Sequence, residues 1–230
     1  MHVLSDIPFQ LDTNKLLSEL HVLPESEDAV EFEKLARQCL AVGKPKTIYK
    51  ESFVDAKGDD SVTIDGVLFK SRVLRMNMDK VERVFPFVVT CGNELDKIKL
   101  PADDPFMQFW LDTIKAAALF CAMRYFDDHL TRMFALGKTS SMSPGAGDAT
   151  VWPIEQQKDL FPLLGNVREQ IGVELTDSCL MIPNKTVSGI KYPTEVSFEA
   201  CQLCYRKNCP GRRAPFDKKL WKSTHATADG

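Results

Sequence analysis

The chain begins with two segments in which apolar residues recur at helical spacing. We predict helices over residues 11–22 and 27–42. Ser26 stands directly before the second segment, where a serine side chain can cap the free backbone N–H groups of the first turn. Gly43 follows it and is typical of the residue that ends a helix.

From residue 46 onward the pattern changes to short runs rich in β-branched and aromatic residues, which are typical of strands. Asp65 and Gly66 separate two of these runs, and an Asp-Gly pair at such a place predicts a type I′ hairpin. The predicted strands cover residues 47–53, 61–64, 67–69, 85–90, 174–183 and 185–192.

The longest helical pattern covers residues 104–136. Its middle, from Trp110 to Phe126, is apolar on almost every side, which indicates a buried central helix. Together the elements predict an α+β fold, with a meander of antiparallel strands and one long central helix. The remaining segments are predicted as a loop over 137–150 and helices after Trp152, over 166–171 and over 198–207.

Composition narrows the class of protein. The chain has 230 residues, of which 44% are hydrophobic, and its 29 basic and 32 acidic residues give a net charge of −3. These values are those of a folded globular protein, and they exclude global disorder and a strongly basic nucleic-acid-binding surface. The longest uncharged apolar run, Ala116–Met123, is far shorter than the roughly 20 residues of a membrane-spanning helix. Met1–Asp12 shows no signal-peptide pattern, so a reducing, cytoplasmic location is expected.

Three of the seven cysteines form a cluster near the C-terminus. Cys201, Cys204 and Cys209 have the spacing Cys-x2-Cys-x4-Cys. Soft thiolates at such spacing suit an iron–sulfur cluster or zinc, and basic residues such as Arg212 and Arg213 would offset their negative charge. Because no histidine lies nearby, we favour iron–sulfur over zinc. Free or redox-active thiols are the alternative interpretation.

Three cysteines are one fewer than the usual four ligands. A fourth ligand would come from Cys91, Cys121 or Cys179, or the fourth position would stay open to substrate or solvent. Cys39 lies on the apolar face of a predicted helix and is expected to be a core residue.

Asp112 is a charged residue inside the apolar long helix. It lies three residues before Lys115, so the simplest prediction is an ion pair between the two. The functional alternative is a carboxylate that faces a ligand-binding cleft. The loop Ser140–Gly147 contains glycines that would let its backbone approach a ligand closely.

Four stretches share a likeness to one known family. They are Phe85–Asp96, Trp110–Ala118, Ser143–Gly145 with the following Trp152–Gln156, and Gly172–Gly189. On these residues the chain resembles, from about residue 45 to 195, the activation domain of cobalamin-dependent methionine synthase in a stand-alone form.

The resemblance implies a C-shaped α/β fold around a twisted antiparallel sheet, with a cleft for S-adenosylmethionine. It also implies docking on a cobalamin domain while inactive cob(II)alamin is reduced and remethylated. The residues that it places at the cofactor-binding cleft are Asp112, Ser143, Pro144 and Gly145.

The departures from the family pattern affect the methyl-donor site. Ser141 and Ala146 stand where the family has an arginine and a tyrosine, and Lys115, Ala116 and a position near Phe120 replace its Gly-Ser and glutamate. S-adenosylmethionine is therefore expected to bind poorly. The cysteine motif, by contrast, is an addition to the family pattern.

These observations predict a helical N-terminal extension (1–44), an activation-domain-like core (45–197) and a cysteine-motif segment with a tail (198–230). The expected function is that of an accessory protein of corrinoid metabolism, which docks on a corrinoid protein and supports its reductive reactivation through a cysteine-bound iron–sulfur cluster. The alternatives are a non-redox module that binds a corrinoid or a corrinoid protein, with zinc or free thiols, and an S-adenosylmethionine-binding activator. A homodimer is also open, because the N-terminal extension could pack on a second subunit.

Overall fold

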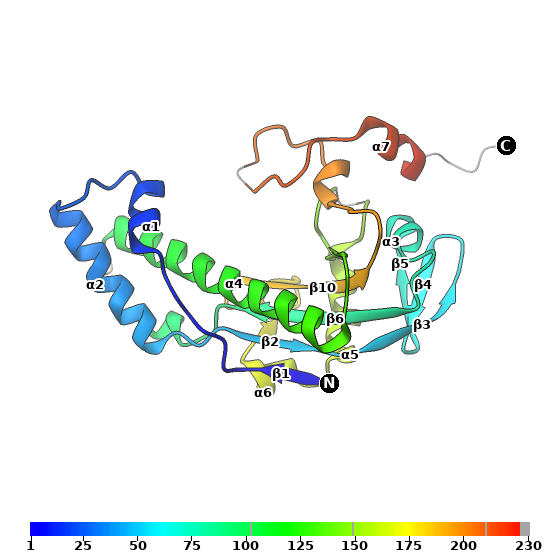
Figure 1. The fold of residues 1–230 in the computed structure, drawn as a ribbon, viewed down its shortest axis with the longest axis horizontal. Helices are drawn as coiled ribbons and strands as arrows, with labels where there is room; N and C mark the ends of the chain where they lie inside the picture. The colour runs from blue at the N-terminus through cyan, green and yellow to red at the C-terminus, as the bar shows by residue number, and fades with distance from the viewer. Residues whose placement is uncertain (102, 149, 210, 226–230) are drawn as a thin grey trace.

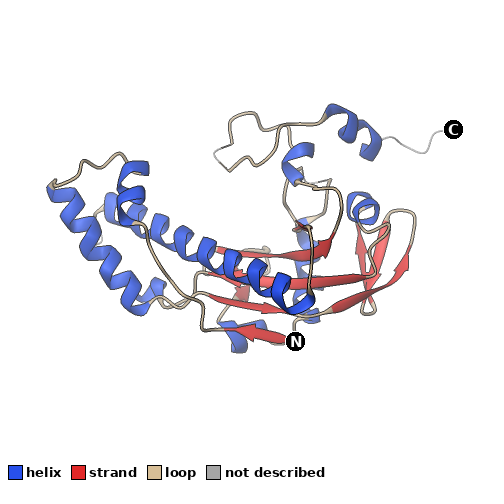
Figure 2. Cartoon of the chain, viewed as in Figure 1, coloured by secondary structure: helices blue, strands red, loops and turns tan. Residues whose placement is uncertain are grey.

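The computed structural model describes residues 1–101, 103–148, 150–209 and 211–225. An antiparallel sheet carries helices on both faces, the N-terminal helices lie at one end of it, and the C-terminal segment lies above it at the top of the view (Figures 1 and 2). The helices are α1 (Thr13–Glu19), α2 (Glu27–Val42), α3 (Arg72–Asn77), α4 (Pro105–Phe134), α5 (Gln157–Leu163), α6 (Val167–Ile171), α7 (Lys218–His225) and the 3-10 turns η1 (Leu95–Lys97), η2 (Ile154–Gln156) and η3 (Ala200–Leu203). The strands are β1 (His2–Leu4), β2 (Lys46–Tyr49), β3 (Ser52–Lys57), β4 (Ser61–Ile64), β5 (Val67–Lys70), β6 (Arg83–Thr90), β7 (Thr139–Met142), β8 (Glu174–Leu175), β9 (Met181–Ile182) and β10 (Thr186–Pro193).

Strand β6 is the centre of the sheet. On one side it pairs with β2 and β3 in succession, and on the other side it pairs with β10. Strand β1 extends the sheet beyond β2, β4 and β5 extend it beyond β3, and β7 extends it beyond β10. The predicted antiparallel α+β fold is confirmed. The predicted simple meander holds only for β3, β4 and β5, because β6 and β10 enter the sheet from later parts of the chain.

Alternate residues of β6 pack against helices on opposite faces of the sheet. Phe85, Phe87 and Val89 share a buried cluster with the second half of α4, whereas Val88 shares one with α6. A strand that is buried on both faces is apolar at nearly every position, which is why 85–90 appears in the sequence as a continuous apolar run.

The N-terminal helices pack on the first half of α4. Phe32 of α2 contacts Trp110 of α4 edge to face, with ring centroids 5.8 Å apart. Cys39 and Cys91 are fully buried in the same cluster. The segment 1–44 therefore shares a core with the long helix, and its β1 strand joins the sheet.

Several elements match the prediction closely. Helix α2 begins and ends where predicted, and the Ser26 side chain accepts a hydrogen bond of 3.2 Å from the Ala29 backbone N–H. Asp65 and Gly66 both adopt positive φ, as a type I′ turn requires. Among the described residues, no helix has the length and apolar character needed to cross a bilayer.

Four predictions of secondary structure were wrong in detail. The strand expected over 47–53 is interrupted after Tyr49, and the loop expected over 137–150 contains β7, whose pairing comes from β10 rather than from an apolar pattern of its own. The strand expected over 174–183 is the hairpin β8–β9, because a turn closes from the Cys179 N–H to the Thr176 carbonyl. The helix expected over 198–207 is reduced to the single turn η3.

Candidate functional site

The three clustered cysteines lie on one continuous segment, the cysteine loop, which runs from η3 to the start of α7. Cys201 belongs to η3, and Cys204 follows it with extended backbone angles, so the helix ends there. All three cysteine residues are partly exposed, and none forms a disulfide.

Arg212 lies inside this loop and holds it together. Its guanidinium donates hydrogen bonds to the backbone carbonyls of Cys201 at 3.1 Å and of Cys204 at 3.0 Å. The same group also donates to the carbonyls of Ala214, at 3.0 Å, and of Arg206. A single side chain thus binds four backbone carbonyls of the loop, of which that of Cys201 also accepts from the Cys204 N–H at the end of η3.

The thiols themselves are less closely gathered than the backbone. The backbone N–H of Arg213 donates to the Cys201 Sγ at 3.4 Å. Over the described residues, no three His, Cys, Asp or Glu side chains come together as a group that could hold a metal ion. The structure therefore brings the three predicted ligands onto one loop but does not arrange them as a coordination sphere.

Both ends of the cysteine loop are anchored to the rest of the molecule. Tyr205 packs against Phe216 with ring centroids 4.5 Å apart, and against Trp221 of α7 at 5.4 Å. The Asp217 backbone N–H donates to the Gln202 carbonyl at 2.8 Å. These contacts close the loop at its base, where Leu203 is fully buried.

The four other cysteines lie in different surroundings. Burial raises the pKa of Cys39 to about 11 and that of Cys91 to about 12. Both lie in the core between α2 and α4, whereas the residues at the base of the cysteine loop belong to the cluster around Trp152. The Cys121 thiol donates to the Gln10 carbonyl, and Cys179 is buried in the turn between β8 and β9.

Asp112 does not pair with Lys115, so that prediction was wrong. Its carboxylate forms an ion pair of 2.7 Å with Lys185 and accepts a hydrogen bond of 3.2 Å from Asn184. Lys115 instead pairs with Asp96. Burial alone would raise the pKa of Asp112, but the hydrogen bonds from Lys185 and Asn184 and the Lys185 charge outweigh it and lower the pKa below its usual value.

The loop that contains Ser143, Pro144 and Gly145 follows β7. Gly145 has a φ of +79°, and a Cβ there would lie 2.9 Å from the Ile154 side chain. A Cβ at Gly147 would lie 2.9 Å from the Ala200 carbonyl oxygen of η3. Packing within the protein thus accounts for both glycines, and the loop packs against η3, the turn that carries Cys201.

Asp112 and the Ser143–Gly145 loop are not brought together. Asp112 contacts Asn184, which precedes β10, whereas Met142, next to the loop, pairs with Ile190 in the second half of that strand. Strand β10 begins at Thr186, four residues before Ile190, so the strand between these two points spans about 13 Å. The two groups therefore lie beside different parts of the chain that forms β10.

Sequence reasoning missed a cation beside this loop. Lys191 pairs in register with Ser141, the position at which the resembled family has an arginine. Its side chain is only 11% exposed, forms an ion pair with Asp127 and lies 5.8 Å from the Phe126 ring centroid. The pairing of Lys191 with Ser141 could have been predicted only if residues 139–142 had been recognised as a strand.

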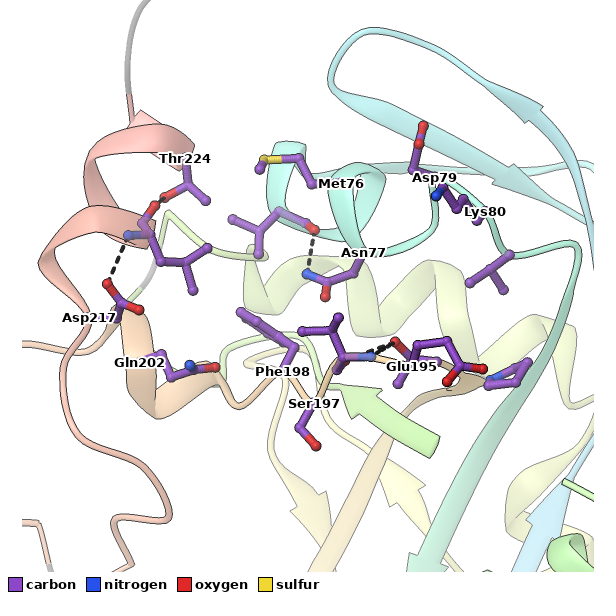
Figure 3. Close-up of a pocket in the computed structure, with 16 residues that line it drawn as sticks. Met76, Asn77, Asp79, Lys80, Glu195, Ser197, Phe198, Gln202, Asp217 and Thr224 are labelled. Atoms are coloured by element: carbon purple, nitrogen blue, oxygen red, sulfur yellow. Dashed lines mark hydrogen bonds between the residues drawn. The ribbon is translucent and has the colours of Figure 1, made fainter. Parts of the chain in front are cut away.

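A pocket of about 780 Å³ lies where the C-terminal segment meets the sheet (Figure 3). Its walls are α3 with the following turn, residues 193–198, η3 and α7. Phe198 and Leu220 contribute apolar surface, and Asn77, Glu195 and Gln202 contribute polar groups. The base of the cysteine loop therefore forms one wall of this pocket.

Comparisons with known proteins show a likeness to solved structures. No protein-family model matches the chain, and no curated protein sequence matches it. Among solved structures it is similar to the crystal structure of the MetH reactivation domain bound to AdoHcy, with a TM-score of 0.62 and 15% sequence identity. The match covers 86% of this chain and 80% of that chain. The fold expected from the family resemblance is thereby confirmed.

Proposed function

We propose that this chain is an accessory protein of corrinoid metabolism, which docks on a corrinoid protein and supports its reductive reactivation. The observation that carries the proposal is the fold that it shares with the MetH reactivation domain over 86% of its length. Sequence motifs at four separate places indicate the same family independently of the fold.

An exposed apolar face on α4 supports docking. Phe106, Phe109 and Phe120 are 68%, 59% and 61% exposed, and their spacing places them along one face of the helix. Three exposed phenylalanines on one helix face are typical of a protein–protein contact surface. We assign the contact with the corrinoid protein to this face.

The cysteine loop is the proposed redox element. Cys201, Cys204 and Cys209 supply three soft sulfur donors on a partly exposed loop, and these donors fit an iron–sulfur cluster better than a hard cation. A cluster bound there would supply single electrons to the corrinoid cobalt. The cationic residues of the loop would offset the negative charge of the thiolates.

S-adenosylmethionine fits the chain less well. Ser141 and Ala146 replace the arginine and tyrosine of the resembled family, and the nearby Lys191 ammonium is already paired with Asp127. Methyl transfer by this chain is therefore not part of the proposal.

A second candidate is a non-redox corrinoid-protein-binding module, with structural zinc or free thiols. It is supported by the hydrogen bonds from Arg212 to the carbonyls of Cys201 and Cys204, which join the backbone of the cysteine loop through a side chain of the protein itself. The two candidates share the docking function and differ in the role of the thiols.

Two measurements test the proposal and separate the candidates. Binding to a corrinoid protein in the cob(II)alamin state, followed by calorimetry, should be weakened by Phe109→Asp with Phe120→Asp, but not by Phe53→Asp, which alters an exposed phenylalanine on β3. Unchanged binding in the double variant would refute the docking face. Anaerobic reconstitution with iron and sulfide should give a broad sulfur-to-iron charge-transfer band in the redox candidate and a colourless protein in the other.

A further inference from the structure

A pocket of about 360 Å³ lies between the α1–α2 connection and the first turns of α4. Leu20 and Leu23 line it from the connection, and Phe106, Phe109 and Trp110 line it from α4. Trp110 is buried, whereas Leu23 is 75% exposed and both phenylalanines are exposed as well. The volume is at the lower end of the roughly 300–1,000 Å³ of ligand pockets, so it suits an inserted side chain. Two phenylalanines of the proposed docking face therefore form one of its walls.

The opposite wall is held in place by its own hydrogen bonds. The Val22 N–H donates to the Leu17 carbonyl at 2.9 Å, and the Ser26 hydroxyl donates to the Leu23 carbonyl at 2.7 Å. The Ser26 oxygen also accepts from the Ala29 N–H, which ties the connection to the start of α2. A wall that is fixed in this way needs little ordering when a side chain enters the pocket.

The surface around the pocket is negatively charged. Residues 16–33 include no lysine or arginine. Two acidic side chains in this range have an ion pair, Glu19 with Lys15 and Glu33 with Arg37. The acidic side chains of this range that form no ion pair within the described part of the chain are Glu25, Glu27, Asp28 and Glu31. A cationic group is therefore what this surface attracts.

Asp28 brings the negative charge to the pocket itself. Its side chain is exposed and lines the same pocket as Phe106 and Phe109. An arginine side chain matches this combination, because its apolar stem packs on leucine and aromatic carbons while its planar guanidinium stacks on aromatic rings and binds a carboxylate. A lysine ammonium is more strongly hydrated and stacks less well. A neutral apolar side chain would leave the Asp28 carboxylate without a partner.

We propose that this pocket receives an arginine side chain of the corrinoid protein and that this arginine anchors the contact at the α4 face. The proposal rests on the proposed function and adds the chemistry by which the partner is recognised. Arginine is enriched among the few side chains that dominate the energy of protein–protein contacts. The unpaired acidic residues around the pocket would face further basic groups of the partner and steer its approach.

A side-chain probe tests the pocket without any partner protein. Nα-acetylarginine methylamide, titrated into the isotope-labelled full chain and followed by NMR, should shift the amide signals of residues 20–28 and 106–110. The citrulline analogue has nearly the same shape but a neutral urea group, and it should bind about two- to fivefold more weakly. Asp28→Asn should weaken binding of the arginine analogue about two- to fivefold, as for a partly exposed ion pair.

Glu27→Gln is the matched control. It removes a carboxylate from the same first turn of α2, where Glu27 and Asp28 both favour the helix, but Glu27 does not line the pocket. Weaker binding in Asp28→Asn but not in Glu27→Gln supports the inference. Equal binding of the arginine and citrulline analogues, or equal losses in the two variants, would overturn it.

Calorimetry with the corrinoid protein in the cob(II)alamin state separates this inference from the proposed function. Asp28→Asn should weaken that binding, and Glu27→Gln should leave it close to the wild-type value. If Phe109→Asp with Phe120→Asp weakens binding while Asp28→Asn does not, the docking function stands and the arginine anchor is wrong. If the corrinoid protein does not bind the wild type at all, the proposed function fails, and the assignment of the pocket to that partner fails with it.

Discussion

Asp112 of α4 forms an ion pair of 2.7 Å with Lys185, at the start of the segment that leads into β10. Lys115 lies one helical turn from Asp112, yet it pairs with Asp96 after the end of β6. Each of these two ion pairs links α4 to a segment that adjoins a strand of the sheet. An ion pair between Asp112 and Lys115 would instead link two residues of the same helix. The pairing is a tertiary contact that stabilises the position of α4 on the sheet.

A double-mutant cycle tests the Asp112–Lys185 pair. Asp112→Asn and Lys185→Met should each lower the free energy of unfolding by about 0.5–1 kcal/mol, because both side chains are partly exposed. The double variant should lose less than the sum of the two single losses. Urea denaturation measures all three variants. Coupling of Asp112 to Lys115 instead of Lys185 would show that the pairing described above is wrong.

The same carboxylate should make stability depend on acid pH. The pKa of Asp112 is lowered in the folded state, so the unfolded chain binds a proton more readily. Its contribution is present above the ordinary aspartate pKa and is lost as pH falls through the lowered value. Wild type and Asp112→Asn should therefore converge in stability in strong acid, and parallel curves down to the lowest pH would contradict this expectation.

Buried thiols should make stability fall at alkaline pH. The pKa of Cys39 is raised to about 11 and that of Cys91 to about 12, from a usual value of 9.0. Above pH 9 the unfolded chain releases these protons first, so it binds fewer protons than the folded chain and stability declines as pH rises. Each group should contribute up to about 1.4 kcal/mol per pH unit.

Urea denaturation between pH 8 and pH 10 measures this slope. Cys39→Ala should reduce this slope, because it removes one of the two buried thiols. Equal slopes in Cys39→Ala and the wild type would show that Cys39 does not carry the effect.

Two glycines have nearly the same φ but different surroundings, so substitutions at them distinguish the cost of backbone strain from the cost of a packing clash. Gly66 has a φ of +78° with open space around it, whereas Gly145 has a φ of +79° and lies against Ile154. Gly66→Ala should cost about 1 kcal/mol from the backbone alone. Gly145→Ala should cost about 1 kcal/mol more, because its Cβ meets Ile154. Thermal melts that give equal losses would mean that the Ser143–Gly145 loop moves freely away from Ile154.

S-adenosylmethionine should bind weakly. Without the arginine and tyrosine replaced by Ser141 and Ala146, the loss of a charge-assisted contact lowers affinity about ten- to a hundredfold. Calorimetry should detect no micromolar binding in the wild type, and the double variant Ser141→Arg with Ala146→Tyr should bind more tightly. Micromolar binding by the wild type would favour an S-adenosylmethionine-using activator.

Elements with a strong local pattern were predictable from the sequence. Strand β6 is a continuous apolar run and is buried on both faces, as its residues indicate. The burial expected on almost every side of α4 was wrong, because its buried residues form one stripe from Trp110 to Leu130 while Phe109 and Phe120 are exposed. Ser26 and the Asp65-Gly66 pair are local signals whose effect needs no distant partner. The likeness at four stretches gave the fold, and two of these stretches lie on β6 and α4.

Features that depend on distant partners were not predictable. Strand β7 is Thr-Ser-Ser-Met, which has no strand pattern, and it becomes a strand because β10 pairs with it. Lys115 pairs with Asp96 because the segment that follows β6 passes close to this part of α4. The role of Arg212 was hidden because four backbone carbonyls converge on it only in the folded loop.

The most direct measurement of the central claim is the rate at which a corrinoid protein loses its cob(II)alamin electron paramagnetic resonance signal under a low-potential reductant. The account predicts faster loss when the iron–sulfur-reconstituted chain is present. It predicts no acceleration by the variant in which Cys201 and Cys204 are serine. A rate that is the same with and without the chain would contradict the proposal that it supports reductive reactivation.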